Sequence, residues 1–261
     1  MSDNLKHITL CLFDILGTSK LIEEKQLSIV DKLYDEMIEL TSRQSGQVCF
    51  GVECLKDGRL VPVGFVGDIG SAWFSDTFIM WTASQQPRVH VFVHNCINVF
   101  CKALEYGIPL RGTISSGEAI MDKEKLKWIG EPIVEAARGE SYQKWLGLSF
   151  GASFRLGLNW DAKLFIPYTA HIKAANTYLS PFVVDWARYW RENKQNDALA
   201  SIAKMDTNPA FSAYYKEAIK FYKFSEDNSQ WWIDVNLSGI HSYGELEKTA
   251  IEWCHSYIAI Y

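Results

Sequence analysis

The chain has 261 residues, of which 48% are hydrophobic and 22% are charged, and its formal net charge is −5. This composition is typical of a globular protein with a substantial core and excludes a disordered chain. The negative charge argues against a general nucleic-acid-binding protein, which usually presents a basic face. It still permits binding of a single nucleotide, because a metal ion can supply positive charge locally.

Six cysteines are scattered along the chain and none forms a CxxC pair, so nothing supports a zinc-ribbon site. The beginning of the sequence lacks the pattern of a secretory signal, and no apolar run has transmembrane length. We therefore expect a cytoplasmic protein with free thiols.

The first 156 residues predict alternating strands and helices. A short apolar run over 7–14 predicts a buried strand, followed by a turn at 17–19 and an amphipathic helix that ends near Arg43. The next expected elements are strands at 47–55, 60–66 and 71–81 (with a turn at Ser75 and Asp76), a helix at 87–106, a strand at 110–119, a helix at 131–144 and a strand at 149–156. This order favours an α+β fold, an antiparallel or mixed sheet with helices on one face.

After about residue 165 the pattern becomes less regular. Helices are expected at 181–193, 197–205, 209–224 and 242–260. We therefore expect a core over 1–165 and a helical C-terminal extension over 166–261 that packs on the same domain.

Two acids and one arginine are the strongest chemical candidates. Asp14 ends the apolar run LCLF before a glycine-containing turn, and Asp76 lies at the tip of an expected hairpin. If the two strands are neighbours, the carboxylates meet, and a divalent cation such as Mg²⁺ or Mn²⁺ would relieve their repulsion. The alternative is a helix cap and a turn residue. Arg138 lies on an expected helix beside two alanines, and its alternative role is a solvated surface arginine.

Four segments in the same order resemble the catalytic domain of class III nucleotide cyclases, which has a ferredoxin-like core. FDILGTSKL looks like the first-strand metal motif, WFSDTFIM like the hairpin with the second metal acid, RGTISSGEA like a later strand motif, and WIGEPIVEAARGE like the helix motif that ends in arginine. The resemblance covers roughly residues 7–155.

The resemblance implies a site for a nucleoside triphosphate and two Mn²⁺ or Mg²⁺ ions. Asp14, Asp76 and the Ile15 carbonyl would be the metal ligands. Arg138 would stabilise charge on the α-phosphate, acting from the second chain of a head-to-tail homodimer. The residues expected to meet the β- and γ-phosphates are Gly17, Thr18 and Ser19.

Three positions depart from the family pattern. Val134 stands where the family has a transition-state asparagine, and Ala72 with Lys127 fits neither the adenylate nor the guanylate code. Lys144 and Lys173 are positioned as contacts for the triphosphate or, alternatively, as solvated lysines.

The closest resemblance within the class is to the bacterial pyrimidine cyclases of the Pycsar anti-phage systems. Ser75 before Asp76, Val134, a DWAR segment at 185–188 and the helical tail are similar to that group. This implies conversion of UTP, favoured over CTP, to the 3′,5′-cyclic monophosphate and pyrophosphate, with a separate effector protein that senses the product. The side chains expected around the nucleotide are Phe13, Phe50, Trp73 and Phe74, and the alternative role for the aromatics is core packing. The alternatives are an adenylate or guanylate cyclase and a non-catalytic cyclase-homology module that binds nucleotide.

Overall fold

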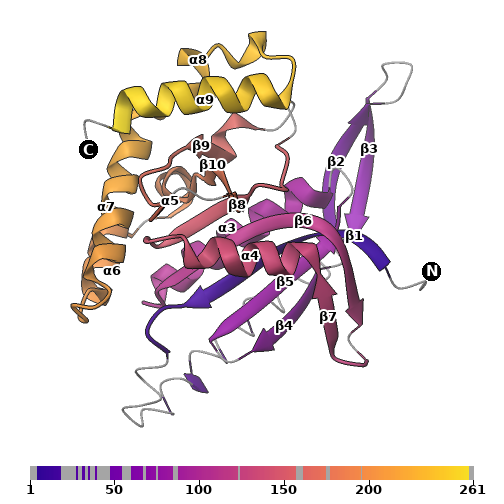
Figure 1. Cartoon of the computed structure of the whole chain (residues 1–261), viewed down its shortest axis with the longest axis horizontal. Coiled ribbons are helices and arrows are strands. Elements are labelled where there is room, and N and C mark those ends of the chain that lie inside the picture. The colour runs from indigo at the N-terminus through magenta and orange to yellow at the C-terminus, as the bar shows by residue number, and fades with distance from the viewer. Residues whose placement is uncertain are drawn as a thin grey trace.

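A mixed eight-stranded sheet connects the N-terminal and C-terminal parts of the chain (Figure 1). The computed structural model describes residues 5–18, 28, 31–32, 35, 39, 48–54, 60–66, 69–74, 76–84, 88–122, 124–156, 161–174, 177–194 and 196–258. The strands of the sheet are β1 (Leu5–Ile15), β4 (Gly70–Phe74), β5 (Thr77–Ala83), β6 (Leu110–Asp122), β7 (Lys127–Gly130), β8 (Gly147–Gly151), β9 (Phe165–Pro167) and β10 (Leu179–Val184).

The strand order is β4-β5-β1-β6-β8-β10-β9, and β7 pairs with the far end of β6. The β6–β8 pair is parallel and the other pairs are antiparallel. A separate antiparallel pair is formed by β2 (Val48–Cys54) and β3 (Leu60–Val66). The helices are α3 (Arg88–Glu105), α4 (Glu131–Ser141), α5 (Trp186–Asn193), α6 (Ala198–Met205), α7 (Ser212–Asp227), α8 (Trp231–Asp234) and α9 (Tyr243–Ile258), with single 3₁₀ turns η1 (Ala162–Leu164) and η2 (Leu237–Gly239).

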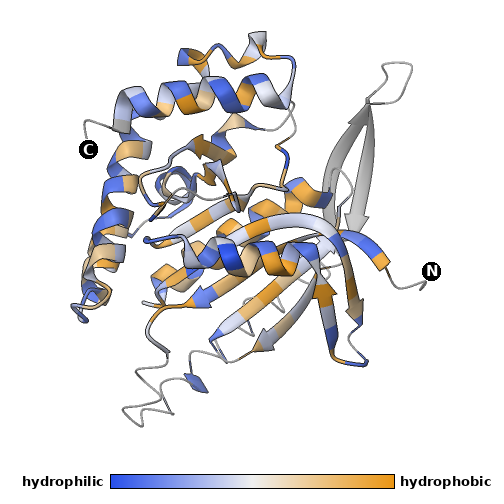
Figure 2. Cartoon of the chain, in the orientation of Figure 1, coloured by the Kyte–Doolittle hydropathy of each residue, from blue (hydrophilic) through white to orange (hydrophobic). Residues whose placement is uncertain are grey.

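Helices cover both faces of the sheet. Successive side chains of a strand point to opposite faces, and in β1 Cys11 and Phe13 join the core cluster that contains α3. Leu10 and Leu12 join a smaller cluster with Ala136 of α4. Figure 2 shows hydrophobic and hydrophilic residues mixed along α4, as in an amphipathic helix with one buried stripe. The α+β fold is therefore confirmed, but the expectation of helices on one face is wrong.

The C-terminal segment contributes strands as well as helices. The helix expected over 181–193 is wrong in its first part, because 179–184 (LSPFVV) forms β10, a strand buried at every position. The Asp185 carboxylate then accepts a hydrogen bond from the Arg188 N–H at 3.1 Å and caps α5. The helices expected over 197–205, 209–224 and 242–260 correspond to α6, α7 and α9.

Some expectations lie outside the described residues. Positions 28, 31, 32, 35 and 39 are helical, while the rest of the helix expected before Arg43 is not described. Ser19 and the side chain of Phe50 also lie outside the description. Within the described part of the chain, no helix is both long and apolar enough to cross a membrane.

Candidate active site

The register of β1 and β5 brings Asp14 and Asp76 to the same end of the sheet. Asp14 pairs with Thr77, the first residue of β5, so Asp76 lies one residue beyond it in the β4–β5 turn. The Ile15 N–H donates to the Asp76 carbonyl oxygen at 2.9 Å. The expectation that the two strands are neighbours is therefore confirmed, and their ends place the two acids side by side.

Asp14 lies in an electrostatically demanding position. Burial raises the pKa of its carboxyl group, Arg111 lowers that pKa, and the charge of Asp76 raises it again. Both burial and the neighbouring acid therefore disfavour the ionised form, and only positive charge nearby offsets them. This is the environment in which a carboxylate pair favours a bound cation.

Arg111 is the cation next to Asp14. It stands opposite Asp14 in the β1–β6 register, and its Nε donates to Asp14 Oδ2 at 2.9 Å. Another guanidinium nitrogen pairs with Glu140 of α4, and a third donates to the Gln143 carbonyl oxygen at 3.3 Å. The Arg111 side chain is only 12% exposed. The sequence motif contained Arg111, but no local pattern indicated its contact with an acid 97 residues away.

The turn after β1 has the conformation expected of a glycine turn. Gly17 has a φ of +87°, in the left-handed region that glycine adopts without strain. Thr18 is buried, and its hydroxyl donates to the Ile15 carbonyl oxygen at 3.1 Å. A carbonyl oxygen has two lone pairs, so this bond leaves Ile15 able to accept a second partner.

The donor set at this edge fits a divalent ion that is shared with a substrate. The described residues contain no group of three or more His, Cys, Asp or Glu side chains arranged to hold a metal. Mg²⁺, however, is usually bound through one or two carboxylates plus substrate phosphates and water. Asp14, Asp76 and the Ile15 carbonyl supply that set.

Arg138 lies on α4 but is directed away from Asp14. Its Nη1 donates to the Tyr178 hydroxyl at 2.9 Å, and its guanidinium carbon lies 5.2 Å from the centre of the Tyr178 ring. Glu140, which contacts Arg111, is two positions further along α4 and so about 200° around the helix. Tyr178 directly precedes β10, which is three strands from β1, or about 14 Å across the sheet. One chain does not bring Arg138 to the acid pair.

Phe13 and Trp73 lie on the opposite face of the sheet from Asp14. Phe13 is fully buried and stacks on Phe78 with ring centres 4.5 Å apart, and Trp73 stacks on the other side of Phe78 at 4.4 Å. Both side chains pack with the core cluster that contains α3. Their packing follows the core alternative, because one step along a strand reverses the face.

The positions beside Asp76, along β7 and on α4 differ in how exposed they are, and Lys127 pairs with Asp122, on the face opposite Asp14. Ala72 is only 7% exposed, whereas Phe74 is exposed and meets Trp128 edge to face at 5.0 Å. Lys127 is exposed. Val134, at the position of the family's asparagine, is also exposed on α4 and offers no hydrogen-bonding group.

A buried polar network fixes the end of α4 against the sheet. The Gln143 amide nitrogen donates to Thr113 Oγ1 at 2.6 Å, and its Oε1 accepts from Ser149 Oγ at 2.8 Å and from the Trp145 indole at 2.9 Å. Ser149 Oγ in turn lies 2.9 Å from the ring of His171, whose pKa burial lowers to about 3. Gln143, whose carbonyl oxygen accepts from Arg111, is thus fixed by side chains of β6 and β8 and by Trp145.

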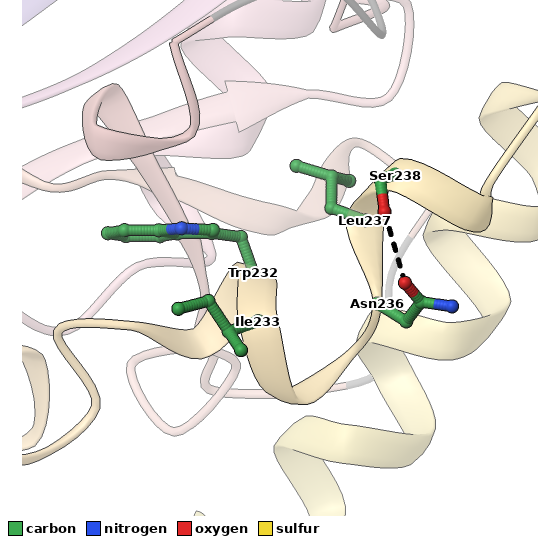
Figure 3. A pocket seen from close by; sticks show the side chains of 5 residues that line it. All are labelled: Trp232, Ile233, Asn236, Leu237 and Ser238. Atoms are coloured by element: carbon green, nitrogen blue, oxygen red, sulfur yellow. Dashed lines mark hydrogen bonds between the residues drawn. The ribbon is translucent and has the colours of Figure 1, made fainter.

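A hollow lies far along the chain from these residues. It has a volume of about 420 Å³ and is lined by side chains of α8 and η2 (Figure 3): Trp232, Ile233, Asn236, Leu237 and Ser238. None of these side chains ionises near neutral pH, so this lining supplies no acid or base.

Comparisons with known proteins gave only structural likenesses. No family model and no curated protein matches the sequence. Two structures of a bacterial light-regulated adenylyl cyclase match at 16% and 15% identity with TM-scores of 0.46 and 0.45, covering 77% and 78% of this chain and 57% of theirs. The catalytic core of a rhodopsin-guanylyl cyclase with converted specificity, in complex with ATPαS, matches at 16% identity and a TM-score of 0.40, over 57% of this chain and 78% of that one. This chain therefore spans just over half the length of the light-regulated enzymes, and its function is inferred below from its own residues.

Proposed function

We propose that this chain is a cytoplasmic nucleotide cyclase that converts UTP, or less readily CTP, to the 3′,5′-cyclic monophosphate and pyrophosphate. The observation that carries the proposal is the β1–β5 register, which places Asp14 and Asp76 together beside the Gly17 turn. An acid pair at a strand end next to such a turn matches the first two motifs of class III cyclases in both order and position.

In the reaction the ribose 3′-oxygen forms a bond to the α-phosphorus, the bond to the β-phosphate oxygen breaks, pyrophosphate leaves, and the hydroxyl proton passes to water. Two Mn²⁺ or Mg²⁺ ions, when bound, lower the pKa of the 3′-hydroxyl and neutralise the leaving group. Asp14, Asp76 and the Ile15 carbonyl would hold these ions. The backbone N–H groups of Gly17 and Thr18 would bind the β- and γ-phosphates.

Arg138 acts on substrate bound to the second chain of a head-to-tail homodimer. Its guanidinium stabilises the charge that grows on the α-phosphate. The support for this arrangement is that Arg138 points toward Tyr178, away from the acid pair of its own chain. An exposed arginine at that place is available to a partner.

The preference for a pyrimidine rests on what is absent at the base-reading positions. The buried methyl group of Ala72 cannot bond to a purine edge, and Lys127 lacks the acid or small polar partner that either purine code uses. Phe74 is the described aromatic side chain exposed beside Asp76, and we place it at the base end of the site. By the resemblance to Pycsar cyclases, the product is a second messenger in anti-phage defence that a separate effector protein senses.

Incubation of the purified chain with each of the four nucleoside triphosphates and Mn²⁺ tests this proposal. We expect cyclic UMP as the main product, with cyclic CMP second, and an Asp14→Asn variant as the inactive control. A preference for ATP or GTP would instead identify a purine cyclase. If no triphosphate yields a cyclic product although one binds, the chain is a non-catalytic module, the alternative that Val134 favours.

A further inference from the structure

The C-terminal segment reaches the candidate site through the start of α7. A Cβ atom placed on Gly17 would lie 3.4 Å from the ring of Phe211, so this ring packs directly on the turn after β1. Phe211 also meets Tyr214 with ring centres 6.0 Å apart. Residues almost 200 positions apart in the sequence therefore form one surface beside Asp14.

The ring of Tyr214 contacts two cationic side chains at this surface. The guanidinium carbon of Arg111 lies 5.4 Å from the centre of the Tyr214 ring, and Lys173 Nζ lies 5.6 Å from the same centre. Both distances are within the range in which the negative face of an aromatic ring attracts a cation. One ring thus holds together two positive charges that would otherwise repel.

The two cations are anchored from the other side by different elements. Arg111 is held by Asp14 and Glu140, and Lys173 Nζ donates to the Ser141 carbonyl oxygen at 2.9 Å. Lys173 is exposed, so its remaining N–H groups can reach a ligand. A pair of cations next to a glycine turn is a surface that suits a polyphosphate chain.

We propose that Tyr214 is a positioning residue that holds Arg111 and Lys173 at the β- and γ-phosphate end of the site, with Phe211 fixing the turn that faces the same phosphates. This inference rests on the proposed function and deepens it. It makes the aromatic side chains at the start of α7 part of the triphosphate site, whereas the sequence had indicated only Lys173 of the C-terminal segment as a contact.

Tyr214 packs at the edge of the core with a partly exposed side chain. The buried residues of α7 are Tyr215, Ala218, Phe221, Phe224 and Ser225. These anchor the helix, whereas Tyr214 is only half-buried and faces the cations. Replacement of Tyr214 should therefore leave α7 in place.

The test is calorimetric binding of inorganic tripolyphosphate with Mn²⁺ to the full chain, alongside steady-state kinetics. Tyr214→Leu should weaken tripolyphosphate binding and raise KM for the nucleoside triphosphate about tenfold, with kcat within about twofold of the parent. Tyr214→Phe keeps the aromatic face and should restore both values. Binding of the cyclic mononucleotide, which lacks β- and γ-phosphates, should not change in either variant.

A matched control lies on the same helix. The Arg191 guanidinium carbon lies 5.2 Å from the centre of the Tyr222 ring, and Tyr222 is two turns, or about 12 Å, along α7 from Tyr214. Tyr222→Leu should leave tripolyphosphate binding unchanged.

The inference is overturned if Tyr214→Leu binds tripolyphosphate as the parent does, if the parent binds none, or if the loss extends equally to the cyclic mononucleotide. The proposed function fails separately. A chain that makes no cyclic nucleotide but loses tripolyphosphate affinity on Tyr214→Leu would keep the polyphosphate site and lose the cyclase assignment.

Discussion

The acid pair at the end of β1 and the arginine on α4 are built in different ways. Asp14 and Asp76 are brought together within one chain by strand register, and Asp14 is partly buried and paired with Arg111. Arg138 is exposed and turned toward Tyr178, three strands away from β1. If both regions serve one reaction, the acid pair of one chain must meet the Arg138 of a second copy. Each chain then contributes to two shared sites.

Removing either acid should have the largest effect on activity. We expect Asp14→Asn and Asp76→Asn each to lower kcat for cyclisation by about a thousandfold or more, because each removes a metal ligand. Discontinuous product assays with Mn²⁺ measure this, and circular dichroism checks folding. Glu118→Gln is the matched control, since Glu118 is an exposed acid near the other end of the β1–β6 pair. Substantial turnover in either aspartate variant would contradict the metal role.

Loss of the arginine should have the next largest effect. Arg138→Ala should lower kcat by about a hundredfold to a thousandfold with little change in KM, because charge stabilisation is needed mainly in the transition state. Arg155, which lies over the ring of Tyr243 at 4.8 Å, provides an exposed arginine control. Equal kinetics for Arg138→Ala and Arg155→Ala would show that Arg138 is a surface residue.

A substitution in the C-terminal core should lower stability and leave both halves of the site intact. Trp231 is 1% exposed and its indole N–H donates to the Phe165 carbonyl oxygen at 3.0 Å. Trp231→Ala should reduce the free energy of unfolding by about 3–5 kcal/mol. Replacing its neighbour Trp232, which lies at the surface hollow, with alanine should reduce the free energy of unfolding by about 1 kcal/mol. Urea denaturation measures both, and equal losses would contradict the assignment of Trp231 to the core.

Asp185 should give a smaller effect than Trp231, seen as a pH dependence of stability. Burial raises the pKa of its carboxyl group to about 6, above the ordinary value of 3.8. The folded chain therefore holds this proton more tightly than the unfolded chain, and stability falls as pH rises from about 4 to about 6. Relative to Asp185→Asn, the parent should lose up to about 3 kcal/mol across this range. Denaturation curves at several pH values test it, and parallel profiles for the two proteins would contradict it.

Local patterns in the sequence predicted the parts of the site that lie on single elements. The apolar run before Asp14 predicted β1, and the turn residues around Asp76 predicted the β4–β5 hairpin, but the adjacency of β1 and β5 was only a condition of the metal hypothesis. Arg138 was selected from a helix motif with two alanine neighbours. The sequence did not decide whether Phe13 and Trp73 face the site or the core, because the face of a strand residue depends on its parity in the strand.

The sequence did not predict contacts between residues that are far apart in the chain. Arg111 meets Asp14 only through the β1–β6 register, and Tyr214 meets Arg111 across about one hundred residues of chain. The strand at 179–184 was read as helix because a short apolar run before a helical segment has no periodicity that distinguishes the two. Only the three-dimensional structure shows these features.

Mixing two inactive variants tests the shared site most directly. Asp14→Asn and Arg138→Ala should each be nearly inactive in making cyclic UMP alone. Combined in equal amounts and allowed to exchange subunits, they should recover about a quarter of the parent activity, because half of the dimers are mixed and each has one intact site. A mixture that stays as inactive as its two components, while the parent chain turns over, would contradict a site built from two chains.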